Sequence, residues 1–156
     1  MNATARKGGG QQGGPRSAAR LAAVQALYQL EMDPDLKPTT AIQEYISHRL
    51  GAEIEGEQYV EADSDLFRDI VEGAWGRRAE IDPLLSDTLS ADWPLDRLER
   101  LIRAVLRAGA YELLARPDVP TAVVITEYVD VAHAFVERAE ARFVNGVLDR
   151  IARDVR

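Results

Sequence analysis

The residues able to carry acid–base, nucleophilic or metal chemistry are few and poorly spaced for it. The two histidines, His48 and His133, lie on different predicted helices and lack the spacing of a zinc-binding pair. The pair Asp63 and Asp65 lacks the glycine and terminal glutamate of a calcium loop. The absence of cysteine excludes disulfides, thiolate metal sites and a cysteine nucleophile. The sequence therefore predicts a protein that is not an enzyme and that uses no metal or cofactor.

A glycine-rich stretch opens the chain. Residues 8–13 contain a literal G-x-G-x-x-G pattern, but no strand precedes it, so a dinucleotide site is not expected. Residues 1–14 combine glycine and glutamine with Arg6 and Lys7 and lack large apolar side chains after the first residue. Such a composition predicts a disordered basic leader.

Charge is unevenly distributed. The net charge of −7 on its own argues against a nucleic-acid partner. Residues 1–20 nevertheless carry four basic residues and no acid, which leaves −11 on the remainder. Residues 31–82 hold 14 acids against five bases. This asymmetry is typical of a protein with two partners of opposite charge.

The length of 156 residues, of which 46% are apolar, indicates one domain, spanning residues 15–156. No apolar run approaches the roughly 20 residues of a membrane-spanning helix. No secretory signal is visible at the N-terminus. A cytoplasmic protein with no membrane partner is therefore expected.

Apolar residues spaced by three and four positions predict an all-α domain of about seven helices. The longest is expected at residues 95–116, whereas residues 52–62 are expected to form a loop. Residues 121–129 favour a strand by their β-branched content, but a lone strand would have no partner, so a helix over 121–137 is preferred. The other predicted helices begin at Pro15, at the capping-box residue Thr40, near 63, near 81 and before Phe143.

Three segments carry a resemblance to a known family. They are RSAARLAAVQALY at 16–28, RAVLRAGAYELLARPDVPTAVVITEYVDV at 103–131 and RFVNGVLDR at 142–150, with Phe67-Arg68-Asp69 between the first two. Their order and spacing resemble the NusB family of bacterial transcription antitermination factors, from about Pro15 to Ile151. The resemblance implies two packed three-helix subdomains. It also implies binding to the single-stranded boxA element of nascent ribosomal-RNA transcripts, together with NusE, a small-subunit ribosomal protein. RNA polymerase would be an indirect partner.

The resemblance also implies an RNA-binding surface. Arg16 and Arg20 are four residues apart and are expected to share one face of the first helix. The family usually has further basic residues where this chain has Ser17 and Ala18, which reduces the expected phosphate contacts. Gln25 also matches a family position. Arg6 and Lys7 of the leader are expected to supply additional positive charge.

Phe135 and Arg142 match positions near the same surface. Phe135 is expected either to stack on a base or to pack in the core. Arg142 is expected to point outward to RNA while Phe143 points inward. For Asn145-Gly146, close packing between helices is the first interpretation and direct RNA contact the second.

The acidic middle of the chain suits a basic ribosomal protein. Parts of residues 63–82, together with the helix at 95–116, are expected to bind NusE through Asp69, Glu72 and Arg103. Two alternatives remain. One is a NusB-like domain related to ribosomal-RNA cytosine methyltransferases, and the other is a NusE-binding adaptor that makes no RNA contact. Self-association into a homodimer is also left open.

Overall fold

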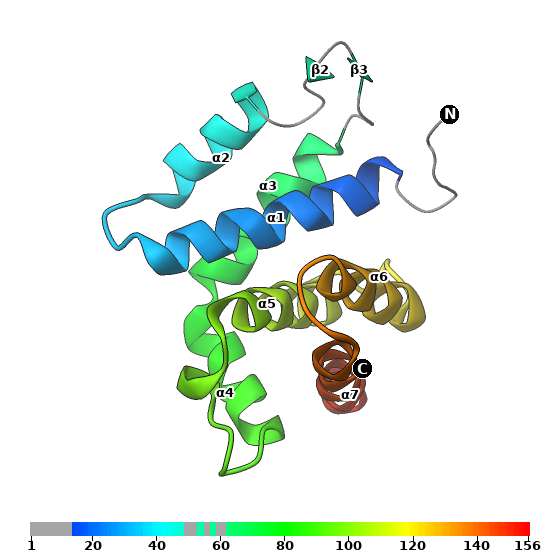
Figure 1. The fold of residues 1–156 in the computed structure, drawn as a ribbon. Coiled ribbons are helices and arrows are strands. Elements are labelled where there is room, and N and C mark those ends of the chain that lie inside the picture. The colour runs from blue at the N-terminus through cyan, green and yellow to red at the C-terminus, as the bar shows by residue number, and fades with distance from the viewer. Residues whose placement is uncertain (1–13, 49–52, 55–56, 59–61) are drawn as a thin grey trace. The chain divides into compact units, whose positions relative to one another are not determined.

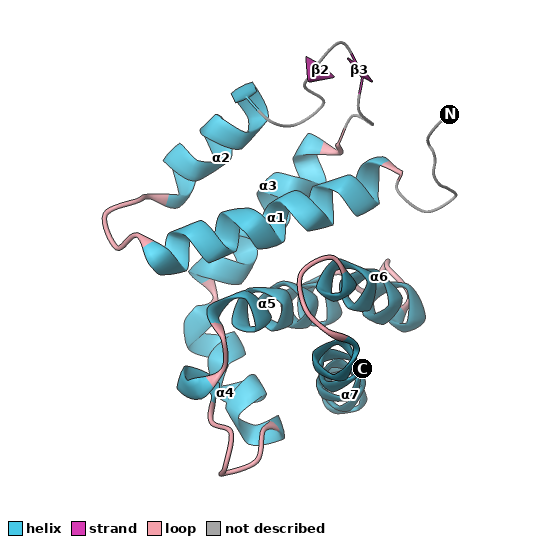
Figure 2. Cartoon of the chain, in the orientation of Figure 1, coloured by secondary structure: helices cyan, strands magenta, loops and turns pink. Residues whose placement is uncertain are grey.

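A computed structural model describes residues 14–48, 53–54, 57–58 and 62–156, and these residues are almost entirely helical (Figures 1 and 2). The all-α prediction is therefore confirmed. The chain forms two compact units, Met1–Val71 and Glu72–Arg156, and each is described by itself. The leader with Arg6, Lys7 and the glycine pattern lies outside the described residues.

The described residues form seven α-helices, which agrees with the predicted number. The first unit contains α1 (Pro15–Met32), α2 (Pro38–His48) and most of α3 (Ser64–Gly76). The second unit contains η1, a turn of 3₁₀ helix, and four α-helices rather than the three expected. Their bounds are α4 (Arg78–Thr88), η1 (Leu95–Arg97), α5 (Arg100–Ala115), α6 (Thr121–His133) and α7 (Arg138–Val155).

In the first unit, α1 packs against α2. The buried face of α1 is mostly small, with Ala19, Ala23 and Ala26 fully buried. The rings of Tyr45 on α2 and Phe67 on α3 stack with their centroids 5.5 Å apart. These aromatic and alanine contacts form the core of the unit.

In the second unit, α5 is the central helix and packs against α4, α6 and α7. Almost all of its residues from 102 to 113 are buried. Gly109 allows α7 to come close, because a Cβ at this position would lie 2.8 Å from Leu148. The close approach of α5 and α7 therefore depends on a residue without a side chain.

The segment whose β-branched content favours a strand is helix α6, as preferred from the sequence. Val124, Tyr128 and Val131 are buried. The Tyr128 hydroxyl donates a 2.5 Å hydrogen bond to the Glu112 carboxylate on α5, and both side chains are fully buried. Packing against α5 thus outweighs intrinsic β-propensity.

Arg156 joins the end of α7 to the end of α5. Its guanidinium group donates hydrogen bonds to the carbonyl oxygens of Glu112, Leu113, Arg116 and Val119. Several of these carbonyls belong to the last turn of α5, where intrahelical donors run out. The side chain therefore acts as a C-terminal cap for a neighbouring helix.

Three predicted boundaries are wrong. Residues 95–116 do not form one longest helix, because Leu98 and Glu99 have extended ψ angles of 148° and 141° that separate η1 from α5. The longest helices in the described part are α1 and α7, with 18 residues each. Helix α6 ends at His133 rather than at 137, and the chain turns before α7 through hydrogen bonds from the Phe135 and Val136 amides to the Ala132 carbonyl.

Helix α2 begins at Pro38 and not at the capping-box residue Thr40. Proline suits the first turn, because its missing N–H would have no partner there. The expected loop at 52–62 contains a short antiparallel pair, β2 (Glu53–Ile54) and β3 (Glu57–Gln58). Glu53 is paired with Gln58 and Ile54 with Glu57.

Candidate RNA interface

The first turn of α1 presents Arg16 to solvent and is anchored from one side. The Asp63 amide donates a 3.0 Å hydrogen bond to the Pro15 carbonyl. The Asp63 carboxylate accepts a hydrogen bond from the Leu66 amide and thereby caps α3. One residue therefore fixes the beginnings of both helices and, with them, the base of the Arg16 side chain.

Arg20 does not share the exposure of Arg16. Its residue is only 2% exposed, and its neighbours Ala19 and Ala23 are fully buried. The prediction that both arginines form one exposed face is therefore wrong for Arg20. The side chain interacts with other groups of the protein, as a buried guanidinium must. Gln25, on the same helix, is half-buried.

Phe135 lies in the connection between α6 and α7, and Arg142 lies inside α7, about one turn from its start. Phe135 is 39% exposed, which excludes the alternative that it packs in the core. Arg142 is exposed on α7, and the adjacent Phe143 is half-buried, as expected. An exposed aromatic ring near an exposed arginine offers a stacking surface and a phosphate contact.

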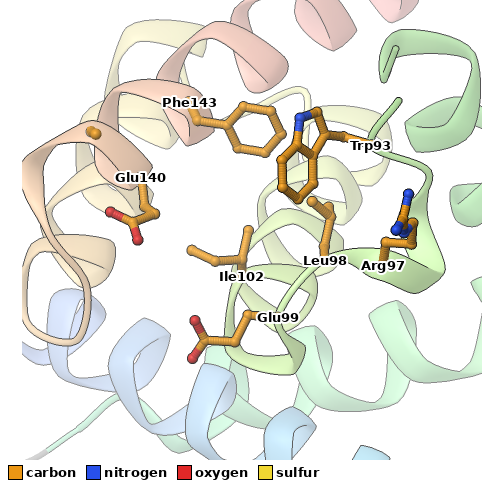
Figure 3. A pocket seen from close by; sticks show the side chains of 8 residues that line it. Trp93, Arg97, Leu98, Glu99, Ile102, Glu140 and Phe143 are labelled. Atoms are coloured by element: carbon orange, nitrogen blue, oxygen red, sulfur yellow. The ribbon is translucent and has the colours of Figure 1, made fainter. Parts of the chain in front are cut away.

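An apolar groove of about 350 Å³ is lined in part by Phe143, the residue that follows Arg142 in the sequence. Figure 3 shows that the rings of Trp93 and Phe143 border it and that the side chains of Leu98 and Ile102 also line it. Glu99, Glu140 and Arg97 supply its polar rim. Trp93 is 59% exposed, so this indole is available to a ligand ring.

Sequence reasoning missed Trp93, which lies just before the helix expected at residues 95–116. The available signal was a large aromatic residue inside a polar, proline-containing connection. Such a residue has no helical face on which to be buried.

The structure contradicts the first interpretation of Asn145-Gly146, which was close packing between helices. Nothing lies within 4 Å of a Cβ built on Gly146, and both residues are exposed. The prediction of close helix packing at Asn145-Gly146 is therefore wrong. The glycine that allows a close approach to α7 is Gly109 on α5. Direct contact with a ligand remains the second interpretation.

The residues expected to bind NusE lie on two helices, α3 and α5. Asp69 is half-buried and Glu72 is exposed, one turn apart on α3. Arg103 is half-buried on α5, where its guanidinium donates a 3.3 Å hydrogen bond to the Asp96 carbonyl. Asp69 belongs to the first unit, whereas Glu72 and Arg103 belong to the second.

The described part of the chain shows no arrangement of side chains typical of a metal site. No cluster of three or more His, Asp or Glu side chains that could hold a metal occurs there. Burial and the neighbouring Glu127 raise the pKa of Asp130, and His133 acts in the opposite direction. Asp130 and His133 both lie on the exposed face of α6, outside the groove. No described helix is long and apolar enough to span a bilayer.

The NusB family profile matches residues 17–153. The transcription antitermination protein NusB of Novosphingobium aromaticivorans is 57% identical over 92% of this chain and 97% of that protein. The chain belongs to the NusB family. The homologous NusB of Bradyrhizobium sp. is 55% identical over 90% of this chain and 83% of that protein.

Solved NusB structures share the fold. Thermotoga maritima NusB superposes with a TM-score of 0.73 at 32% identity, covering 90% of this chain and 92% of that chain. A NusB solved with NusE and double-stranded RNA gives a TM-score of 0.72 at 22% identity, covering 88% and 96%. NusB proteins are transcription antitermination factors and are not enzymes, and this chain shares that general role.

Proposed function

We propose that this NusB protein binds the boxA element of nascent ribosomal-RNA transcripts together with NusE, in the cytoplasm, and so acts on RNA polymerase indirectly. The observation that carries the proposal is the exposure of Phe135 and Arg142 around the start of α7, together with a groove bordered by exposed Trp93 and half-buried Phe143. Phe135, Trp93 and Phe143 offer ring faces, and Arg142 offers a guanidinium group. A solved complex of a NusB with NusE and RNA supports the choice of partners.

The chemistry of single-stranded RNA fits these side chains. Unstacked bases bind to aromatic rings, and each such stack contributes about 1–3 kcal/mol. Arginine binds phosphate through a planar pair of N–H groups. Exposed Arg16 in the first unit adds a further cation, whereas buried Arg20 does not.

An adaptor that binds NusE without touching RNA is the second candidate. The burial of Arg20 favours it, because that burial removes one of the two cations expected on α1. The adaptor and the RNA-binding factor differ in what arginine substitutions do to RNA affinity.

Replacing Arg16 and Arg142 with alanine is expected to weaken binding to boxA and to a scrambled RNA alike. Both guanidinium groups are proposed to contact phosphates, which carry no sequence information. Each lost contact with a single strand lowers the salt dependence of binding by about 0.7. Fluorescence anisotropy over a salt series, with NusE present, measures both quantities. The control is Lys37→Ala, which removes an exposed cation outside the residues expected to bind RNA or NusE. Equal affinities for all three proteins would favour the adaptor.

Reversing Asp69 and Glu72 to lysine is expected to slow NusE association at low salt. These carboxylates lie one turn apart on α3, and charge complementarity mainly raises association rates. Stopped-flow or surface binding kinetics measures the rate. The matched control reverses Asp35 and Glu44, two exposed acids of the first unit that lie outside the residues expected to bind NusE. The assignment of these carboxylates to the NusE surface is rejected if both double variants associate at the same rate.

A further inference from the structure

One face of α7 carries a line of exposed residues, and all but the central one are arginines. Steps of four, four, four and three residues lead along the helix, and every residue of the line is exposed. We call this line the α7 ridge, and it consists of Arg138, Arg142, Gly146, Arg150 and Arg153. The opposite face is buried through Val144, Leu148 and Ile151. Because residues three and four apart share a helix face, the ridge runs for roughly 22 Å at 1.5 Å per residue.

Most of the arginines on the ridge are not engaged by the protein. Among the described residues, Arg138, Arg142 and Arg150 make no hydrogen bond or ion pair. Arg153 is the exception, since its guanidinium donates a 2.7 Å hydrogen bond to Asp149. Glu140 and Asp154 are also exposed on α7 but lie off the line, whereas Asp149 lies on the same face and pairs with Arg153. The ridge is therefore a positive strip on a protein of net charge −7.

The middle of the ridge is bare. Gly146 has nothing within 4 Å of its Cβ position, and Asn145 beside it is exposed. A glycine inside a helix costs about 0.5–1 kcal/mol relative to alanine when nothing requires it. Here no packing within the described residues requires it. The bare position allows a bulky ligand backbone to approach the helix between two pairs of arginines.

We propose that the α7 ridge binds the phosphates of RNA that continues beyond the boxA element, with Arg150 and Arg153 as the contacts farthest from Phe135. This inference rests on the proposed function and adds a second RNA segment to it. The linear spacing of the cations matches a polyanion that follows the helix. An acidic protein is the competing partner, but its carboxylates would not form a regular line that needs a bare helix centre.

The test compares a short boxA-type RNA with the same RNA extended by about eight nucleotides at either end. Both are titrated with the mixture of this protein and NusE. We expect one extended RNA to bind several-fold tighter than the short RNA. The double substitution Arg150→Ala with Arg153→Ala should remove that gain, lower the salt slope by about 1.4 and leave the short RNA unaffected. The control, Lys37→Ala, removes an exposed cation that has no assigned binding role and should keep the gain.

Two further substitutions test the centre of the ridge without disturbing packing. Gly146→Glu places a negative side chain in open space and should also abolish the gain from the extension. Asp149→Asn removes the carboxylate that engages Arg153 and should increase the gain.

The outcomes separate the two proposals. If the mixture of the unmodified protein and NusE does not bind the short RNA, the proposed function itself is overturned. Normal short-RNA binding with no gain from either extension would overturn only the ridge. A gain that survives both the double substitution and Gly146→Glu would also overturn it.

Discussion

Replacing Asp82 with alanine is expected to destabilise the second unit by about 2–3 kcal/mol. The Arg107 guanidinium holds the Asp82 carboxylate through two parallel hydrogen bonds of 2.9 and 3.0 Å, which join α5 to α4. The Arg107 side chain is 10% exposed and that of Asp82 is 30% exposed. Without the carboxylate, the nearly buried Arg107 guanidinium loses both of these hydrogen bonds. Water still reaches the place of the Asp82 side chain, which limits the loss of stability.

The matched control for this pair is Asp149→Ala. Asp149 also binds an arginine, at 2.7 Å, but both side chains of that pair are about half exposed or more. An exposed pair four residues apart contributes only about 0.3–0.5 kcal/mol. Urea unfolding followed by tryptophan fluorescence measures both variants, because Trp75 and Trp93 lie in the second unit. Similar losses from the two substitutions would contradict the role assigned to burial.

Replacing Gly73 with alanine is expected to destabilise the second unit by about 1–3 kcal/mol. A Cβ on Gly73 would overlap the ring of Tyr111, which is only 6% exposed. The ring has little room to move, since the Arg77 guanidinium lies over it at 5.9 Å from its centroid. The added methyl group must therefore displace either the ring or the helix that carries it.

Gly146→Ala is the matched control, because this glycine also lies inside a helix but faces open space. It should stabilise the protein by about 0.5–1 kcal/mol through helix propensity. Thermal and urea unfolding of the two variants should therefore move in opposite directions. A stabilised Gly73→Ala protein would show that Tyr111 does not pack against α3.

Local patterns in the sequence predict the helices well and their ends less well. The apolar spacing around Val124, Tyr128 and Val131 correctly favours a helix where β-branched residues favour a strand. The break at Leu98 and Glu99 was not predicted, because two extended residues leave the spacing of apolar positions on either side unchanged. The roles of Gly73 and Gly109 depend on which helices meet, and that information is not local in the sequence.

The candidate interface could be predicted in part. The resemblance located Phe135 and Arg142, and the structure places both at the surface. Helical spacing alone placed Arg20 beside Arg16, but a neighbour four residues along can already lie on the buried edge of the helix. The α7 ridge becomes visible only when hydrogen bonding separates its arginines from Arg156, whose guanidinium caps α5.

The most direct test of the account is a three-way titration of boxA RNA with this protein alone, with NusE alone and with both. Because few cations of this protein are exposed beside its aromatic rings, the account predicts that the mixture binds much more tightly than either component. Scrambling the boxA sequence should weaken the mixture specifically. Binding by the mixture that is no tighter than binding by NusE alone would contradict a direct role for this protein in holding RNA.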